Sequence, residues 1–237
     1  MNVGEAISRV DWQAAELALK DSGFALISGL FSPEQCDELR SLYADADVVY
    51  RKTVEMSRYS YGMGEYKYFA YPLPEPVDQL RSLVYARLAP VANQWMQQLG
   101  RESRFPQSLE AFLAFCHEHD QTLATPLLLT YGEGGFNTLH QDIYGEVWFP
   151  LQGTVFLDQP RQDYSGGEFV ISEQISGRAS RLKVVNPQKG DLLIFATQFR
   201  PVPVADGFQP AIVEHGVCEI SRGQRMTLGV IFHDASK

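Results

Sequence analysis

Three residues with metal-binding side chains are spaced so that they could build one site. His140 and Asp142 lie two positions apart, so both side chains face the same side of an extended strand. A second histidine, His215, comes much later in the chain. Two imidazoles and one carboxylate form the facial triad of non-haem Fe(II) sites, which leaves metal positions open for other ligands and O2. The pattern predicts that His140, Asp142 and His215 bind Fe(II).

An arginine, Arg225, follows His215 after ten residues and begins an otherwise apolar run. A buried guanidinium suits a carboxylate, because it donates two parallel hydrogen bonds. Thr227 lies two residues beyond Arg225 and shares its face of a strand, where its hydroxyl could add a bond. Tyr131, just before the metal-binding strand, could donate a third. These residues predict a pocket for a dicarboxylate co-substrate beside the metal.

Each assignment has a simpler structural alternative. His140 and Asp142 could form a hydrogen bond within a loop, and His215 could be a core histidine with its polar atoms satisfied. Arg225 could be an exposed charge at a strand edge, although its apolar neighbours favour a buried partner. Tyr131 fits a core or rim position as well as a binding role.

Other candidate ligands are given structural roles. His117, His119 and Asp120 resemble a metal-binding cluster, but they fall at the end of a predicted helix, where the helix dipole favours histidine. His233 follows the last predicted strand and is expected to be a tail residue. Glu168 could lie near the site, but a role in a turn and strand fits it equally well.

Composition indicates a folded chain of 237 residues in one domain, with 45% hydrophobic and 21% charged residues. The net charge of −9 argues against a large nucleic-acid-binding surface. The cysteines contain no CxxC pair and are expected to be buried, reduced thiols. We find neither a signal-peptide pattern nor an apolar run long enough for a membrane. A cytoplasmic protein without an obligate protein partner is predicted.

The sequence before residue 125 favours helices. Asp11 is a candidate N-cap for a helix over 12–21, and Gly23 lies just past its end. Ser32–Gln35 forms a capping box with proline at the first helical position. Pro90 is expected to kink or split a longer helix over 77–99. Residues 1–124 are therefore predicted to form a mostly helical support, with one short strand at 24–28 and a further helix near 109–116.

The sequence after residue 125 favours strands. Short runs rich in Val, Ile, Leu and aromatic residues alternate with Gly, Pro and Asp clusters, which is typical of a sandwich or barrel. The predicted class is α+β with a mainly β core, a double-stranded β-helix (jelly roll) at 125–237 with the N-terminal helical layer packed against it. The predicted strands are 126–131, 146–151, 154–157, 168–171, 182–185, 192–196, 213–218 and 226–232.

Five tyrosines and one phenylalanine gather between Arg58 and Tyr71, interrupted by glycines and accompanied by Lys67. Aromatic and basic side chains together suit base stacking and phosphate contact, so residues 50–74 could be a substrate lid. Packing of the helical layer onto the β core explains the same residues equally well. Arg178, Arg181 and Lys183 form a second basic cluster, which is predicted to be a solvated strand edge.

Several motifs occur in the order typical of one superfamily: residues 128–132, His140–Asp142, Gly166–Val170, Lys189–Phe195, His215–Val217 and Arg225–Thr227. Together with residues 23–45, they resemble 2-oxoglutarate/Fe(II)-dependent dioxygenases over most of the chain. The stretch at 64–74 resembles a bacterial branch described as oxygenases acting on damaged nucleic acid. The resemblance implies a jelly-roll fold, Fe(II), 2-oxoglutarate as co-substrate, and O2.

Three functions remain open. The first is decarboxylation of 2-oxoglutarate coupled to hydroxylation or oxidative demethylation of a substrate, for which damaged or single-stranded nucleic acid is one candidate. The second is hydroxylation of a protein side chain or a small metabolite, which the net charge and the spacing of ten residues between His215 and Arg225, similar to that of prolyl hydroxylases, favour. The third is a jelly-roll binding protein that lost catalysis, against which the intact set of residues argues.

Overall fold

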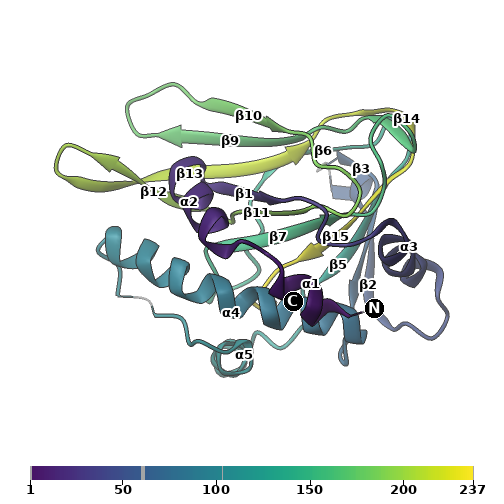
Figure 1. Ribbon diagram of the computed structural model, residues 1–237, viewed down its shortest axis with the longest axis horizontal. Helices are drawn as coiled ribbons and strands as arrows, with labels where there is room; N and C mark the ends of the chain where they lie inside the picture. The colour runs from purple at the N-terminus through teal and green to yellow at the C-terminus, as the bar shows by residue number, and fades with distance from the viewer. Residues whose placement is uncertain (1, 60–61, 103, 237) are drawn as a thin grey trace.

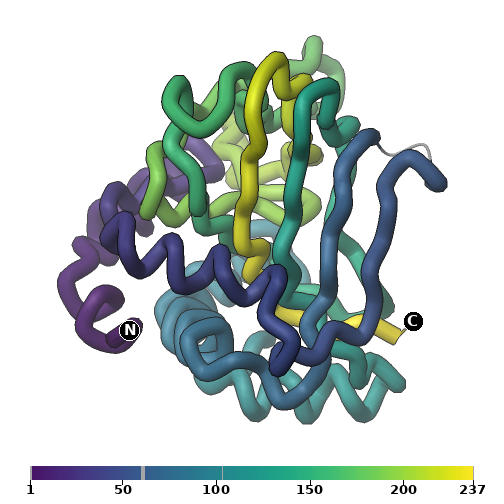
Figure 2. Tube along the Cα trace, turned by 90° about the vertical axis from the view of Figure 1, so that its right-hand side faces the viewer, coloured from purple at the N-terminus to yellow at the C-terminus, as the bar shows by residue number. Residues whose placement is uncertain are grey.

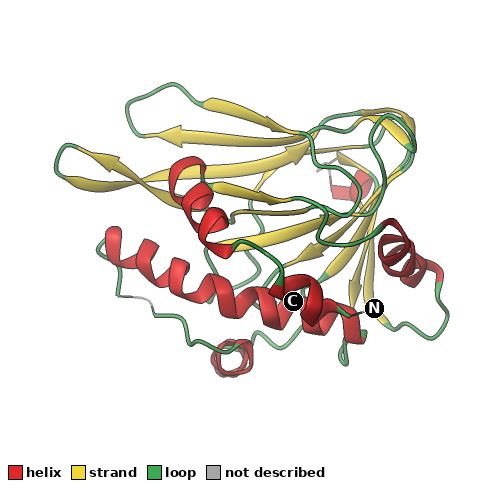
Figure 3. Ribbon diagram, in the orientation of Figure 1, coloured by secondary structure: helices red, strands yellow, loops and turns green. Residues whose placement is uncertain are grey.

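The computed structural model describes residues 2–59, 62–102 and 104–236, which combine helices with mostly antiparallel sheets (Figures 1 and 3). The α-helices are α1 (Val3–Ser8), α2 (Trp12–Ser22), α3 (Pro33–Ser41), α4 (Glu75–Gln98) and α5 (Leu109–Glu118). Short 3-10 helices are η1 (Leu42–Ala44) and η2 (Met56–Tyr59). Among the described residues, no helix combines the length and apolar character needed to cross a membrane.

Two large sheets make up the β core. One has seven strands in the order β1-β11-β7-β15-β5-β4-β2, and the other has five on its main path, β10-β9-β13-β6-β3, with β12 beside β13. The strands are β1 (Phe24–Ile27), β2 (Tyr50–Glu55), β3 (Gly62–Met63), β4 (Glu65–Phe69), β5 (Leu127–Tyr131), β6 (Phe136–His140), β7 (Leu151–Phe156), β8 (Tyr164–Gly166), β9 (Phe169–Ile175), β10 (Arg181–Val185), β11 (Leu192–Ala196), β12 (Phe199–Val204), β13 (Gly207–Val217), β14 (Ile220–Gly223) and β15 (Arg225–Val230).

The two sheets face each other across a core of aromatic side chains. Phe169 on β9 and Phe195 on β11 belong to different sheets, and their ring centroids are 5.0 Å apart. Phe195 also lies 4.7 Å from the imidazole of His215 on β13. Inward-facing side chains of both sheets therefore meet, as expected for packed antiparallel sheets. The mixed α+β class with a mainly β core is confirmed.

Helix α4 runs beneath the seven-stranded sheet (Figure 1). It buries Val77, Leu80, Val84 and Leu88, whose spacing of three and four residues defines one face of a helix. Pro90 lies inside α4, and the helix continues past it to Gln98. The predicted helix is therefore confirmed, and the proline does not split it.

The predicted helix boundaries are confirmed where a side chain satisfies the free backbone groups. Asp11 accepts a hydrogen bond from the backbone N–H of Ala14 at the start of α2. Gly23 ends α2 with φ +79°, a left-handed conformation that favours glycine. Ser32 and Gln35 form the predicted capping box of α3. Local sequence is sufficient here because each cap acts within one helical turn.

The N-terminal half contains more strand than the sequence suggested. Strands β2 and β4 lie at 50–55 and 65–69, where they extend the seven-stranded sheet beyond β5 (Figure 2). Tyr66 and Tyr68 oppose Leu129 and Leu127 in that extension. The expectation of a mostly helical segment is wrong there, because alternating tyrosines favour a pleated, half-buried surface. Ser60 and Tyr61 of this segment lie outside the described residues.

The predicted and observed strands differ at two places in the C-terminal half, and each difference has a specific cause. Residues 146–150 are not a strand, because the Gln121 amide takes both backbone groups of Val147 that a neighbouring strand would have bonded. The sequence did not predict strand β12 or the first part of β13, because these segments contain prolines, which disfavour strands. Pro201 and Pro210 in fact oppose each other in this hairpin.

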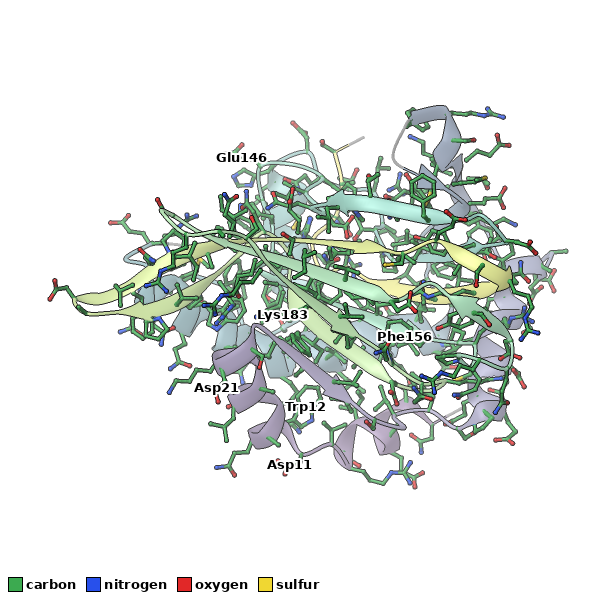
Figure 4. The ribbon with its side chains drawn as sticks, turned by 90° about the horizontal axis from the view of Figure 1, so that it is seen from above. Asp11, Trp12, Asp21, Glu146, Phe156 and Lys183 are labelled. Atoms are coloured by element: carbon green, nitrogen blue, oxygen red, sulfur yellow. The ribbon has the colours of Figure 1, made fainter. Side chains whose placement is uncertain are left out.

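Some side chains differ from expectation in their exposure. Cys36 and Cys116 are buried as predicted, but Cys218 is exposed. Lys183, labelled in Figure 4, was expected on a solvated edge. Its Nζ instead donates to the backbone O of Ser22 at 2.7 Å and pairs with Glu173 at 3.2 Å. It therefore ties β10 to the end of α2.

Candidate metal centre

The two histidines of the predicted triad come from neighbouring strands. His140 ends β6 and opposes His215 on β13, so the pairing of these strands sets the imidazoles side by side. Asp142 lies two residues beyond β6. One ligand atom from each of the three residues lies within 4.8 Å of the others. The structure therefore brings the three residues together, although they stand far apart in sequence.

The Asp142 carboxylate is held by several partners. Its Oδ2 lies 3.3 Å from Nε2 of His215, and its Oδ1 lies 3.7 Å from Nε2 of His140. The Tyr144 hydroxyl donates to Oδ1 at 2.6 Å. Burial raises the pKa of Asp142, but the hydrogen bonds and charges of its neighbours outweigh burial and hold that pKa well below its usual value. Asp142 is therefore an anionic oxygen donor.

The surroundings of the two imidazoles suit metal binding. Burial lowers the pKa of His215, and the nearby His140 lowers it further. Nδ1 of His140 lies 2.8 Å from the backbone O of Thr138, so a proton on Nδ1 leaves Nε2 free to face Asp142. Metal-binding histidines commonly carry such a hydrogen bond on the other ring nitrogen. The donor set is that of a facial triad.

Arg225 lies inside the β core, with 2% of its surface exposed. Its guanidinium carbon lies 5.6 Å from the Tyr131 ring centroid and 5.1 Å from that of Phe156. Nε and Nη2 have no hydrogen-bond partner among the residues that the structure describes. A buried cation with unused donors is costly, so this site is built for an anionic ligand.

The glycine pair of the Gly166–Val170 motif makes room for Arg225. Gly167 has φ +67°, and a Cβ at this position would lie 3.1 Å from Cδ of Arg225 and 2.2 Å from Cδ1 of Ile220. A larger residue is therefore excluded by both backbone conformation and space. This explains in physical terms why glycine stands beside the guanidinium.

The predicted residues line one small cavity of about 50 Å³ between the sheets. It contains the triad together with Arg225, Thr227 and Tyr131. Burial raises the pKa of Tyr131 to about 12, so its hydroxyl keeps its proton and can donate. Gln152 lines the same cavity, and its Nε2 has no partner within the described part of the chain. Sequence reasoning missed Gln152, because one glutamine in a strand gives no signal.

A second cavity of about 350 Å³ opens beside the triad. The aromatic segment contributes Tyr66 and Tyr68 to its wall, and the loop after β6 contributes Tyr144. The Arg51 guanidinium carbon lies 4.3 Å from the Tyr68 ring centroid. Tyr66 and Tyr68 on β4 thus form part of a cavity wall next to His140 and Asp142. A wider groove of about 670 Å³ between α2 and β1 includes no triad residue.

The remaining histidines behave differently from one another. His117 and His119 belong to no possible metal cluster among the described residues. His233, expected in a tail, is fully buried, and its Nδ1 accepts from the backbone N–H of Phe149 at 3.3 Å. The tail expectation is wrong because the chain end is held in place by paired backbone bonds between Leu123 and Ala235.

Sequence comparison gives one family and two close relatives. Residues 64–235 match the model of a family described as "Oxygenase, catalysing oxidative methylation of damaged DNA". Two uncharacterized proteins of Mycobacterium tuberculosis, from strains CDC 1551 / Oshkosh and ATCC 25618 / H37Rv, are each 42% identical over 168 residues. These residues make up 71% of this chain and 72% of each relative. The family match contains the triad and Arg225.

Solved structures share the fold at low sequence identity. A Trichoplax adhaerens prolyl hydroxylase, in complex with a hypoxia inducible factor peptide fragment, gives a TM-score of 0.58 at 13% identity over 98% of this chain and 92% of that chain. A Pseudomonas putida prolyl-4-hydroxylase gives 0.55 at 15% over 94% and 98%. A Burkholderia pseudomallei oxidoreductase of the 2OG-Fe(II) oxygenase family gives 0.55 at 13% over 97% and 95%. These similarities show the fold.

Proposed function

The chain belongs to the oxygenase family that residues 64–235 match, and from this we propose that it is an Fe(II)- and 2-oxoglutarate-dependent dioxygenase. The observation that carries the proposal is the juxtaposition of a His-Asp-His group with a buried arginine, two of whose nitrogens have no hydrogen-bond partner among the described residues, in one cavity. The two facing sheets support the double-stranded β-helix that the sequence predicts.

Each side chain has a role in this proposal. His140, Asp142 and His215 would hold the metal through two nitrogens and one carboxylate oxygen. Arg225 would bind the far carboxylate of 2-oxoglutarate, with Thr227 and Tyr131 adding hydroxyl contacts. When bound, iron would let O2 oxidise 2-oxoglutarate to succinate and CO2, with one oxygen atom entering succinate and the other inserted into a substrate C–H bond. The protein would bind and orient the reactants.

We propose alkylated nucleic acid as the first candidate substrate. The family description names damaged DNA, and three tyrosines line the cavity beside the triad. Tyrosine rings stack on bases whatever their sequence, which suits a lesion on an unpaired base. Hydroxylation of an N-methyl group releases it as formaldehyde, so oxygen insertion would remove the methyl group.

Hydroxylation of a protein side chain or small metabolite is the second candidate. The net charge of −9 favours it, because a nucleic-acid substrate is attracted by a basic surface. Turnover that is strongly inhibited by salt would support nucleic acid. Turnover that needs no nucleic acid and changes little with salt would support the second candidate.

The first test is anaerobic binding. Purified protein mixed with Fe(II) and 2-oxoglutarate should develop the weak metal-to-ligand charge-transfer band in the visible region, and His140→Ala should abolish it. Absence of the band in folded wild-type protein would favour a binding protein without catalysis. The substrate is tested next by succinate release on methylated single-stranded DNA and RNA, with unmodified strands as controls. No stimulation by any lesion would reject the nucleic-acid candidate.

A further inference from the structure

Gln152 occupies the middle of the seven-stranded sheet with its side chain turned inward. It opposes Phe195 on β11, whose ring lies 4.7 Å from the His215 imidazole. Its neighbour Gly153 opposes Val230, at the far end of β15 from Arg225. Side chains alternate along a strand, so Gln152 and Thr154 share the face that lines the small cavity. Gln152 therefore lies at the metal end of this cavity and Arg225 at the other.

The Gln152 side chain is buried without the partner that burial ordinarily requires. The residue is 2% exposed, and its Nε2 makes no hydrogen bond with any described residue. Buried amides are nearly always hydrogen-bonded, because an unmet donor loses its water without compensation. A leucine of similar size would fill the position at no such cost. The amide is thus a donor prepared for a ligand.

The other unmet donors in this cavity define that ligand. Nε and Nη2 of Arg225 also lack partners among the described residues, and they face the same cavity. Nδ1 of His215 is unmet as well, but this nitrogen lies on the ring edge away from the metal-facing Nε2. A ligand with oxygen acceptors at both ends would satisfy Gln152 and Arg225 together. 2-Oxoglutarate has this form, with a 2-oxo acid at one end and a carboxylate at the other.

We propose that Gln152 is a co-substrate-binding residue, whose Nε2 donates to an oxygen at the 2-oxo acid end of 2-oxoglutarate while Arg225 binds the far carboxylate. The inference rests on the proposed function and adds a polar contact to the wall opposite His215. Because Gln152 carries no charge, it can accept the ligand without opposing the positive charge of the metal site.

The test separates co-substrate binding from metal binding. Mn(II) affinity of the full chain is measured first without 2-oxoglutarate, and 2-oxoglutarate affinity is then measured by calorimetry in saturating Mn(II). Gln152→Leu should bind Mn(II) like the wild type and 2-oxoglutarate about tenfold to a hundredfold more weakly, which is the range for one hydrogen bond to a charged acceptor. Gln152→Glu should lose more, because two carboxylates would face each other. Gln174→Leu, an exposed residue on β9, is the matched control.

Each outcome decides between the proposals. Unchanged 2-oxoglutarate affinity in Gln152→Leu would overturn the role of Gln152 and leave the dioxygenase proposal intact. Weaker Mn(II) binding in Gln152→Leu without co-substrate would show that Gln152 orients His215 instead, which also overturns it. If the folded wild type binds Mn(II) but no 2-oxoglutarate, the proposed function itself fails. Melting temperature confirms that each variant is folded.

Discussion

Arg81 and Arg225 are the two most deeply buried arginines among the described residues, and they differ in what surrounds them. Arg81 on α4 is fully buried and donates to five acceptors. Arg225 on β15 is almost as buried, yet two of its nitrogens have no partner in the described residues. The protein supplies acceptors for the first guanidinium, whereas it leaves two nitrogens of the second without an acceptor among the described residues. Burial alone therefore does not separate structural from functional arginines, and hydrogen-bond satisfaction does.

The acceptors around Arg81 explain its structural role. Nη2 lies 2.8 Å from Oδ1 of Asp234, and Nη1 donates to the Tyr71 hydroxyl at 2.7 Å. The backbone oxygens of Ile231 and Phe232 accept two further bonds. Asp234 is itself fully buried, so removing either partner strands a charge. Arg81 thereby fastens the C-terminal segment after β15 to α4.

The largest expected effect is on folding at Arg81. Arg81→Met should lower the free energy of unfolding by about 3–5 kcal/mol, because the buried Asp234 carboxylate loses its guanidinium partner. Chemical denaturation measures the change. Arg87→Met, at an exposed position of the same helix, should change stability by less than about 0.5 kcal/mol. Equal effects of the two substitutions would mean that the buried hydrogen bonds do not distinguish Arg81.

Arg225 should show the opposite behaviour. Arg225→Met should weaken 2-oxoglutarate binding about a hundredfold, since a bidentate contact to a carboxylate is lost. Stability without ligand should stay unchanged or rise, because the substitution removes a buried charge, two of whose nitrogens have no acceptor among the described residues. Calorimetry and thermal unfolding of the same samples measure both quantities. Arg222→Met on β14 is an exposed control. A large loss of stability with normal binding would reverse the assignment of the two arginines.

The pH dependence of the free energy of unfolding tests the surroundings of Arg81, whose charge acts on the buried His233. Burial and the positive charge of Arg81 lower the pKa of His233 from 6.5 to about 3. Between these values the unfolded chain binds a proton that the folded chain does not, so the stability present above pH 6.5 is lost as the pH falls toward 3. The expected slope from this one group is about 1.4 kcal/mol per pH unit. His233→Asn keeps an acceptor for Phe149 and should flatten the slope of unfolding free energy between pH 6 and pH 5.

The sequence predicted the parts of the fold that depend on local chemistry. The caps at Asp11 and Ser32 were correct because their bonds close within one turn. Strand pairing depends on distant segments, so β4 could not be identified as the neighbour of β5. Tyr66 and Tyr68 were noticed as a group, but the wall that they form needs a sheet that the sequence does not show.

The sequence indicates some residues of the candidate site and not others. The residue types and spacing of the triad and of Arg225 are distinctive, so the sequence alone indicates them as candidate site residues. Gln152 is a neutral residue of a common type, and it is notable only because its buried Nε2 has no hydrogen-bond partner in the described part of the chain. The burial of His233 could not be predicted either. It arises from contacts of the last residues with Leu123 and Phe149, which are distant in sequence.

The smallest effect is expected for a substitution of Tyr144. This residue extends the comparison of buried charges with and without hydrogen-bond partners to the candidate metal site. Asp142 resembles Arg81 in having its partners within the protein, and the Tyr144 hydroxyl is one of them at 2.6 Å. Tyr144→Phe keeps the ring but frees Oδ1, so the carboxylate loses one of the bonds that fix its orientation. We expect Mn(II) to bind about tenfold more weakly, the usual lower range for a residue that orients a metal ligand.

Tyr50→Phe is the matched control for this prediction, because it also removes one hydroxyl from a hydrogen bond, here to the backbone O of Leu42 at 2.7 Å. Its Mn(II) affinity should equal that of the wild type, even if its melting temperature falls. Metal titration of both variants without 2-oxoglutarate measures the difference. Equal metal affinities in Tyr144→Phe and wild type would mean that the two imidazoles alone position Asp142. The comparison would then change, because the Tyr144 hydrogen bond would not contribute to positioning the Asp142 carboxylate for the metal.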